Sequence, residues 1–458
     1  MLLTIAGLSS CMGPRPSVPP DAKVDPPPAW RGNAPTTVTT NRATTLNSHW
    51  WREFGDSTLD QLVELAARQN DDQSIAVARV TEARAALKLA RAQLLPSVNV
   101  LATGEREAGI SPFGRADQQT DGGFGASIAY DADIFGRLRS AHAAAKARLF
   151  ETEAIRDVVK LSVTSIVAAS YISLRALDAR LDIAESTLTL RAESLQIAKR
   201  RYAVGYSTAL DLKLAEAEYL ATKRLIPELH LALASEENAL SVVLGNSPGA
   251  IPRGRALGDL TIPALPSALP AAVVRQRPDI YAAEQHLIGA DHSLSAARAA
   301  FLPNIQLEAG AGRAFSTLYP EPISLWSLGG SILAPIFEGG ALHAQQDIAA
   351  ARRDQAAFVY RRTVLTAFSE VEDQMTRIRD TGAQIEILVA QADALAAASR
   401  LATRRYRTGY SPYLDQLDAE RSLLDAQLSV VQTKANYLLA FVDLFRAMGG
   451  GWVAENAT

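Results

Sequence analysis

Apolar residues recur at every third or fourth position through most of this chain, which is the spacing that predicts helices with one buried face. The longest such stretch, 136–203, contains no proline and would be about 100 Å long as one continuous helix. A second stretch of the same kind occupies 340–407, and shorter ones follow at 209–244 and 413–447. The chain is therefore expected to consist largely of long helices packed along partners.

The first long helix carries an apolar seam with heptad spacing, which is interrupted only by Arg191. Its members are Leu174, Leu177, Leu181, Ala184, Leu188, Leu195, Ala198 and Tyr202. The second long helix repeats this spacing with Ile385, Leu388, Ala392, Leu395, Ala402 and Tyr406. A rod-like coiled coil has the same pattern, so the seams alone leave that alternative open.

Two other stretches alternate small or apolar residues with polar ones, which is the pattern of strands. Each follows a helical stretch that ends at Pro96 or Pro303, because proline disfavours helix at the residue before it. Hairpins are therefore expected at 97–131 and 304–335. The individual strands are expected at 98–110, 124–130, 305–315 and 323–333, with a loop at 111–123 inside the first hairpin.

The chain is an internal duplication. The segment from Arg200, RRYAVGYSTALD, returns from Arg404 as RRYRTGYSPYLD, with eight of twelve residues identical and an offset of 404 − 200 = 204 positions. LARAQLLPSVNV from Leu89 likewise returns from Ala296 as AARAAFLPNIQL. Two copies of one unit therefore fill nearly the whole chain, and function is expected in what the two halves jointly enclose.

The repeat sets the expected domain organisation. In chain order we expect a signal peptide at 1–10, a proline-rich tether at 11–49, the first repeat at 50–247, a connector rich in proline and glycine at 248–269, the second repeat at 270–448 and a tail at 449–458.

Cys11 is the only cysteine, and it ends the sequence LSSC after a short apolar run. Leucine, two small residues and cysteine resemble a bacterial lipoprotein signal, in which Cys11 would become the lipidated first residue of the mature chain. The run lacks the basic residues that normally open a signal peptide, so a chance cysteine in a tail is the alternative. Met12 follows instead of aspartate, which in that resemblance favours delivery to the outer membrane.

Composition limits the choice of partners. The 46 basic and 49 acidic residues give a net charge of −3, which argues for neither nucleic acid nor an anionic membrane surface as partner. No uncharged apolar run reaches the roughly 20 residues of a membrane-spanning helix. If the chain crosses a bilayer, we therefore expect it to cross as strands.

Strands of about ten residues are long enough to cross a bilayer at a tilt of roughly 45°. Four strands cannot close a barrel, and an open sheet in lipid would leave unpaired N–H and C=O groups along its edges. The strands must then form a closed barrel with those of other chains. Three chains with twelve strands are the smallest assembly that gives a wide pore. Soluble hairpins that pair with each other are the alternative.

Together these features resemble the TolC-type outer-membrane efflux proteins, and the lipidated, NodT-like branch most of all. The motifs that carry the resemblance are the two helix-to-strand junctions, QRPDI at the start of the second copy, the paired RRY-x-x-GYS turns and the closing FRAMGGGW. They extend from Trp50 to Trp452. The resemblance implies a mixed α and β membrane protein. It would be a homotrimer with a 12-stranded β-barrel in outer-membrane lipid, a long α-helical barrel in the periplasm and an equatorial domain at mid-height.

A gate is expected where the last helix begins. Asp415 and Asp418 lie three residues apart and so share one helix face, and in a trimer they would form carboxylate rings able to hold cations in a constriction. The resemblance implies an aspartate ring and a bulky apolar ring at this place, which fall on Asp418 and Leu414, with Asp415 as a second acid. The alternative is that both acids merely follow the preference of helix N-termini for negative charge.

Residues on and near the turns are further candidates. Arg404, Arg405 and Tyr406 are expected to pair with these acids or with a neighbouring subunit, although arginine near a helix C-terminus is also favoured for dipole reasons alone. The turns Gly205-Tyr206-Ser207 and Gly409-Tyr410-Ser411 reverse the chain at glycine. They are either plain turns or, as the resemblance implies, docking points for the helical hairpins of a periplasmic adaptor.

No enzyme active site and no cofactor are expected. The six histidines are not at metal-ligand spacing, and a lone cysteine that serves as lipid anchor cannot be a nucleophile. The motif Gly310-Ala311-Gly312 lies in a strand pattern with no helix after it, unlike a dinucleotide-binding loop.

The expected function is that of the outer-membrane channel in a tripartite efflux system. Such a channel is a passive exit duct for drugs or other small toxic compounds, delivered by an inner-membrane resistance-nodulation-division transporter through a periplasmic adaptor. A duct for type I protein secretion and a periplasmic coiled-coil scaffold without a pore are the alternatives.

Overall fold

A computed structural model describes residues 17–25, 27, 30, 47–110, 114, 116–265, 276–317 and 321–453. Cys11 and the expected signal peptide lie outside the described residues, and so do most of the expected tether and the end of the connector.

The chain folds into two compact units, and each unit combines segments from both sequence repeats. The first unit comprises the described residues within Met1–Val24, Ala78–Glu153 and Tyr281–Thr363. The second comprises those within Asp25–Val77, Ala154–Ile280 and Val364–Thr458. The boundary between the units therefore cuts through each repeat instead of separating one repeat from the other.

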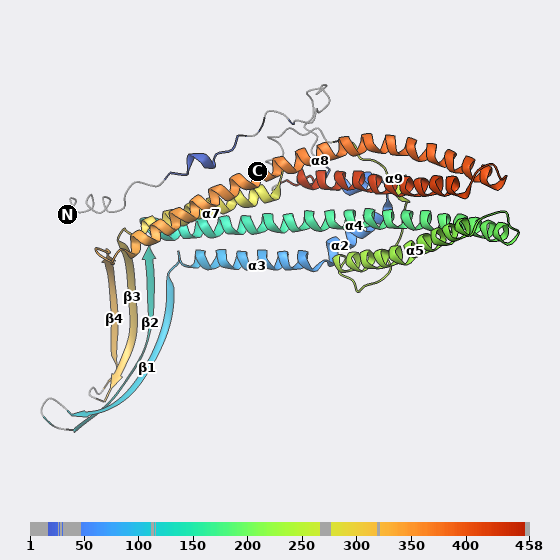
Figure 1. Cartoon of the computed structure of the whole chain (residues 1–458). Helices are drawn as coiled ribbons and strands as arrows, with labels where there is room; N and C mark the ends of the chain where they lie inside the picture. The colour runs from blue at the N-terminus through green and yellow to red at the C-terminus, as the bar shows by residue number, and fades with distance from the viewer. Residues whose placement is uncertain are drawn as a thin grey trace. The chain divides into compact units, whose positions relative to one another are not determined.

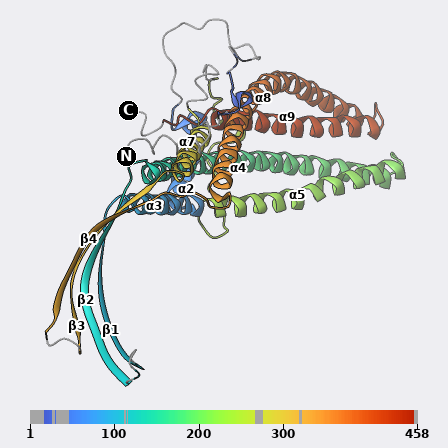
Figure 2. The same ribbon diagram turned by 90° about the vertical axis from the view of Figure 1, so that its left-hand side faces the viewer.

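Four antiparallel strands form the sheet of the first unit, in the order β1-β2-β3-β4 (Figure 1). Their bounds are β1 Ser97–Ile110, β2 Ala116–Ala132, β3 Asn304–Ser316 and β4 Ile323–Leu333. The strands lie side by side as one curved sheet in both views (Figure 2). Because β2 and β3 pair from Asp121↔Ser316 to Ala132↔Ile305, the two hairpins form one continuous sheet.

The predicted loop at 111–123 is wrong over most of its length, because β2 already begins at Ala116. The segment from there to residue 123 pairs with β1. Its glycines and polar residues indicated a turn, but strand pairing is made by backbone groups. Gly122 also leaves room for the ring of Phe315 on the next strand, since a Cβ on Gly122 would lie 2.4 Å from that ring.

The four helices predicted at 136–203, 209–244, 340–407 and 413–447 begin and end within one residue of those positions. The helix bounds are α2 Ser57–Gln69, α3 Asp71–Ala92, α4 Arg137–Ala203, α5 Ala209–Val243, α7 Pro278–Ala299, α8 Ala341–Arg407 and α9 Tyr413–Ala447. The sequence predicts a kink or a break at Pro227, and the structure shows that α5 is not broken there. Pro227 is exposed, so water can bind the carbonyl that loses its helical donor.

α4 contains an 18-residue stretch that is long and apolar enough to cross a membrane, with a mean hydropathy of 1.4. However, 44 % of that stretch is buried within the protein. α4 also supplies Val167, Tyr171, Ile172 and Leu174 to the core of the second unit. Packing therefore accounts for the apolar character of α4, and the stretch is weak evidence for a membrane span.

Asp56 joins the connector between the repeats to the core of the second unit. One of its carboxylate oxygens accepts hydrogen bonds from the Tyr171 hydroxyl at 2.7 Å and from the backbone N–H of Arg255 at 2.8 Å. Burial by itself raises the pKa of Asp56, but the hydrogen bonds from Tyr171, Arg255 and the start of α2 outweigh burial and lower it. The ionised carboxylate is therefore the form that the fold stabilises.

Two motifs of the resemblance contact each other in the second unit. Arg277 of QRPDI is buried and donates a hydrogen bond to the carbonyl of Ala447, the last residue of α9, at 2.7 Å. The same guanidinium binds the carboxylates of Asp279 and Glu370, each at 2.7 Å. Gly449 of FRAMGGGW has a φ of 84°, and a Cβ there would lie 1.8 Å from the carbonyl oxygen of the residue before Arg277. Both motifs thus have a structural role.

Candidate functional site

The sheet of the first unit has one apolar and one polar face. Successive side chains of a strand alternate between faces, and the strand register decides which residues share a face. One face carries Val98, Val100, Phe124, Ile128, Tyr130, Leu307, Ala309, Trp326, Leu328 and Ile332. The other carries Asn99, Glu105, Glu107, Ser127, Asp131, Gln306, Glu308, Ser327 and Ser331. Several residues depart from this division: Leu101, Ile323, Leu325 and Leu333 lie on the polar face, and Arg106, Gln118, Thr120, Arg313 and Ser324 lie on the apolar face.

The apolar face is uncovered, and the sheet has two free edges. Trp326 is 82 % exposed in the single chain, and Val100 and Leu328 are exposed to a similar degree. Among the described residues, no strand pairs with the outer side of β1 or of β4. In water, such a surface between two unpaired edges favours aggregation. In lipid the apolar face is stable, but the edges then require partner strands.

The second candidate site is the tip of the second unit, where α4 turns into α5 and α8 turns into α9. A small apolar cluster holds the tip together: Leu195, Ala198, Ala215, Tyr406, Tyr413 and Leu417. The rings of Tyr406 and Tyr413 are tilted against each other with their centroids 5.4 Å apart. The guanidinium of Arg201 lies 4.4 Å from the centre of the Tyr406 ring and donates a hydrogen bond to the Arg407 carbonyl at 2.8 Å. The two helical hairpins are thereby joined at the tip.

The predicted gate residues Leu414, Asp415 and Asp418 all lie on the exposed face of α9. Leu414 is 58 % exposed, whereas Tyr413 and Leu417 on the other face are buried in the tip cluster. Neither carboxylate forms a hydrogen bond or an ion pair with a side chain in the part of the chain that the structure describes. The three side chains are therefore available for contacts outside their own chain.

Asp415 and its counterpart in the first repeat have different surroundings. Asp211 takes part in a capping box, in which the Thr208 hydroxyl accepts from the Asp211 N–H at 3.1 Å and the Asp211 carboxylate accepts from the Thr208 N–H at 3.2 Å. In α9 the N-cap residue is Pro412, which has neither a side-chain acceptor nor an N–H. Asp415 thus lacks the reciprocal capping contact that explains an aspartate at position 211.

The predicted gate-stabilising residues do not contact these acids within the described chain. Arg404 donates a hydrogen bond from Nε to the Arg400 carbonyl on its own helix at 3.4 Å. Arg405 is exposed, and Tyr406 is buried in the tip cluster. Their pairing with a neighbouring subunit stays a prediction.

Sequence reasoning missed a buried ionic network near the tip. The Glu218 carboxylate on α5 accepts hydrogen bonds from Arg191 Nη1 on α4 at 2.5 Å and from Arg421 Nε on α9 at 2.8 Å. The available signal was the interruption of the first apolar seam at Arg191. A charged residue at a seam position is stable only with a buried partner, and the sequence alone did not indicate which acid that partner is.

A second set of polar contacts lies near this network on α9. Gln416 is buried, and its amide nitrogen donates to the Ser194 hydroxyl at 3.1 Å and to the Glu420 carboxylate at 2.6 Å. Burial raises the pKa of Glu420, while the hydrogen bond from Gln416 and the charge of Arg191 partly oppose that effect. The start of α9 is therefore held to α4 and α5 by polar as well as apolar contacts.

The turns at the tip are exposed and contain glycine in the left-handed region. Gly205 has a φ of 78° and Gly409 a φ of 84°. Tyr206 is 83 % exposed, and Tyr410 is exposed to the same degree. The described residues contain no cluster of histidine, cysteine, aspartate and glutamate that could hold a metal ion.

The sequence matches a known family over most of its length. The model of the outer membrane efflux protein family matches residues 62–246 and 269–450, one segment in each repeat. The chain belongs to the outer membrane efflux protein family. It is accordingly an outer-membrane channel protein of an efflux system, and the resemblance that the repeat and its motifs indicated is confirmed.

Similar proteins agree with this assignment. The pyoverdine export outer membrane protein OpmQ of Pseudomonas putida is 32 % identical, over 98 % of this chain and 97 % of its own. The toluene efflux pump outer membrane protein TtgF of Pseudomonas putida is 35 % identical, over 88 % of this chain and 85 % of its own. Among solved structures, the open state of the Neisseria gonorrhoeae MtrE outer membrane channel is 30 % identical with a TM-score of 0.84, and the match covers 97 % of this chain and 99 % of MtrE.

Proposed function

We propose that three copies of this chain close into one passive exit duct. Twelve strands would form a β-barrel in the outer membrane, and the long helices would continue it as an α-helical barrel in the periplasm, with the connector at an equatorial belt. The observation that carries this proposal is the four-stranded sheet, whose exposed apolar face lies between two unpaired edges. Closure with further copies pairs both edges and turns the apolar face to lipid.

The proposed system is tripartite, with an inner-membrane resistance-nodulation-division transporter and a periplasmic adaptor that docks at Gly205-Tyr206-Ser207 and Gly409-Tyr410-Ser411. The names of the similar proteins cite pyoverdine, solvents and toluene. They support small organic compounds as cargo over secreted proteins. A scaffold without a pore would have no use for the exposed apolar face of the sheet.

The proposed periplasmic gate consists of Leu414, Asp415 and Asp418, repeated around the trimer axis. Two observations support this gate: the three residues share one exposed face of α9, and Asp415 has no capping partner at Pro412. Rings of carboxylates in a constriction bind cations, so divalent cations should block the closed duct.

The trimer and the gate are tested separately on purified protein. The mass of the detergent-solubilised particle should correspond to three chains, and a stable monomer would refute the proposed assembly. In planar bilayers, replacing both Asp415 and Asp418 by alanine should raise conductance and weaken the block by divalent cations. Asp425→Ala, on the exposed face of the same helix, is the matched control. Equal conductance and equal block in the two variants would refute the gate while leaving the trimer standing.

We also propose that Cys11 carries the lipid anchor. Cells that express the wild-type chain should incorporate labelled palmitate into it, and Cys11→Ser should abolish the incorporation. Labelling that persists in the Cys11→Ser variant would exclude this residue as the anchor.

A further inference from the structure

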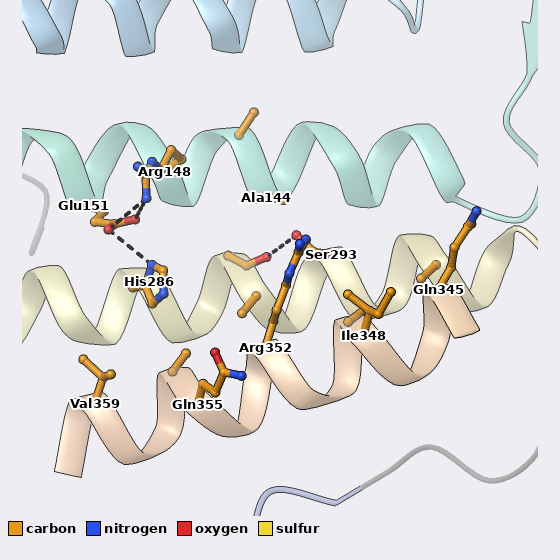
Figure 3. A pocket seen from close by; sticks show the side chains of 16 residues that line it. Ala144, Arg148, Glu151, His286, Ser293, Gln345, Ile348, Arg352, Gln355 and Val359 are labelled. Carbon is orange, nitrogen blue, oxygen red and sulfur yellow. Dashed lines mark hydrogen bonds and ion pairs between the residues drawn. The ribbon is translucent and has the colours of Figure 1, made fainter. Parts of the chain in front are cut away.

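We propose that the first unit contains a binding site for small amphiphilic monoanions, which a passive duct does not require. The site is a cavity of about 840 Å³ lined by α4, α7 and α8 (Figure 3). Ligand pockets in proteins are typically about 300 to 1,000 Å³, so this cavity has the size of a site for a drug-sized molecule.

The floor of the cavity is formed by small residues of α7: Gly289, Ala290, Ser293 and Ala297. A Cβ at Gly289 would be in ordinary van der Waals contact with the Cβ of Ala147 on α4, at 3.5 Å. Larger apolar side chains, Ile348 and Val359, line the cavity from α8. The cavity thus offers an apolar surface to a compact hydrophobic body.

The lining also contains charged side chains, some grouped at one end of the cavity and one that extends from α8. Glu151 is buried, and its two carboxylate oxygens accept hydrogen bonds from Arg148 at 3.0 and 3.1 Å. The same carboxylate also contacts His286 Nδ1 at 3.2 Å (Figure 3). These contacts already satisfy the one carboxylate in the lining. Arg352 is an exposed residue that extends from α8 toward α7, and Glu151, the one carboxylate of the lining, binds Arg148 and His286 instead (Figure 3). The lining therefore carries an excess of positive charge beside an apolar floor.

This combination selects one class of ligand. An anionic head can bind the Arg352 guanidinium, which presents several N–H donors to a carboxylate, sulfonate or phosphate. The apolar body then covers the alanine and glycine floor, where its burial is favourable. A cationic amphiphile of the same size would meet the same excess positive charge and is disfavoured.

The test uses the full-length protein in discs of zwitterionic lipid, with binding measured by calorimetry. The probe is cholate below its micelle concentration, and dihexanoyl-phosphatidylglycerol is the second probe, which represents a membrane-derived anion. Wild-type protein should bind at least one of them. Arg352→Gln should weaken that binding about tenfold, whereas Arg362→Gln, an exposed arginine elsewhere on α8, should leave it unchanged.

A second variant separates charge from shape. Ala290→Leu fills the floor of the cavity without changing its charge. It should weaken the binding of both probes, while the thermal unfolding transition stays at the wild-type temperature. Tighter binding of cholate assigns the site to soluble amphiphiles, and tighter binding of the lipid assigns it to the membrane. Equal affinities of Arg352→Gln and Arg362→Gln, or no binding of either probe up to millimolar concentration, would overturn the proposal.

Discussion

Replacing Glu218 by glutamine tests whether the buried network holds the tip of the second unit together. The side chains of Glu218 and Arg191 are only 9 % and 5 % exposed, respectively, whereas that of Arg421 is half exposed. Glutamine keeps the shape of Glu218 but removes its charge. Arg421 can then turn to water, but the charge of Arg191 is left buried without a counter-ion.

The magnitude follows from that asymmetry. Removing one partner of a buried ion pair costs about 3 to 5 kcal/mol, because the other charge stays buried and uncompensated. Arg191 keeps its hydrogen bond to the Glu218 backbone carbonyl at 3.1 Å, so we expect the lower end, about 3 kcal/mol. A change of this size raises the equilibrium constant for local opening roughly 100-fold.

Amide hydrogen exchange measures that opening directly. Peptides from the start of α9, residues 413–424, should exchange roughly 100-fold faster in Glu218→Gln. Glu228→Gln is the matched control, because Glu228 lies on the same helix and pairs with Arg224 at the surface. Exposed pairs contribute at most about 1 kcal/mol, so the control should change exchange by less than about fivefold.

A second substitution checks the cause. Arg191→Met removes the buried charge, and combined with Glu218→Gln it should restore slow exchange, since buried pairs can be replaced by apolar residues without loss of stability. If Glu218→Gln and Glu228→Gln accelerate exchange equally, the buried network contributes no more than a surface ion pair and does not hold the tip together.

Three further predictions concern other parts of the chain. Arg277→Met should destabilise the second unit by about 3 kcal/mol, seen as a lower thermal midpoint, because two carboxylates and a helix-end carbonyl lose their common donor; an unchanged midpoint would contradict this. The pKa of Asp56 is lowered in the fold. Its contribution to the free energy of unfolding is therefore complete above the unfolded pKa of about 3.9, and it is lost as the pH falls through the lower folded pKa. The thermal midpoint of Asp56→Asn should therefore fall less steeply below about pH 4 than that of the wild type, and parallel curves would exclude this role. Trp326→Arg on the apolar sheet face should reduce the yield of folded trimer, at a cost of about 2 to 4 kcal/mol in mid-membrane, whereas Ser327→Arg on the polar face should be tolerated; equal yields would count against the barrel.

Much of the secondary structure could be predicted from the sequence, because periodicity is a property of neighbouring residues. The strand predicted at 323–333 is β4, Ile323–Leu333, and the helix predicted at 413–447 is α9, Tyr413–Ala447. The early start of β2 could not be predicted, because its residues become a strand only through pairing with β1. Local composition there indicates a turn, and the partner strand overrides it.

The candidate site was predictable only in part. The spacing of Asp415 and Asp418 placed both on one helix face, and the structure has that face exposed. The role of Arg191 was not predictable, because its partner Glu218 lies on the next helix, α5, and Arg421 lies in the other repeat. Such a contact depends on how the helices pack.

The duplication of long helices and strand hairpins follows from the amino-acid sequence alone, since both copies carry the same local patterns. The differences between the copies depend on how the helices pack in three dimensions. Tyr202 and Tyr406 occupy equivalent positions in the RRY motif, but Tyr202 is half exposed while Tyr406 is buried beside Arg201 from the other copy. Asp211 is used in a helix cap and Asp415 is not. Equivalent residues acquire different environments because segments distant in the chain pack against one copy and not against the other.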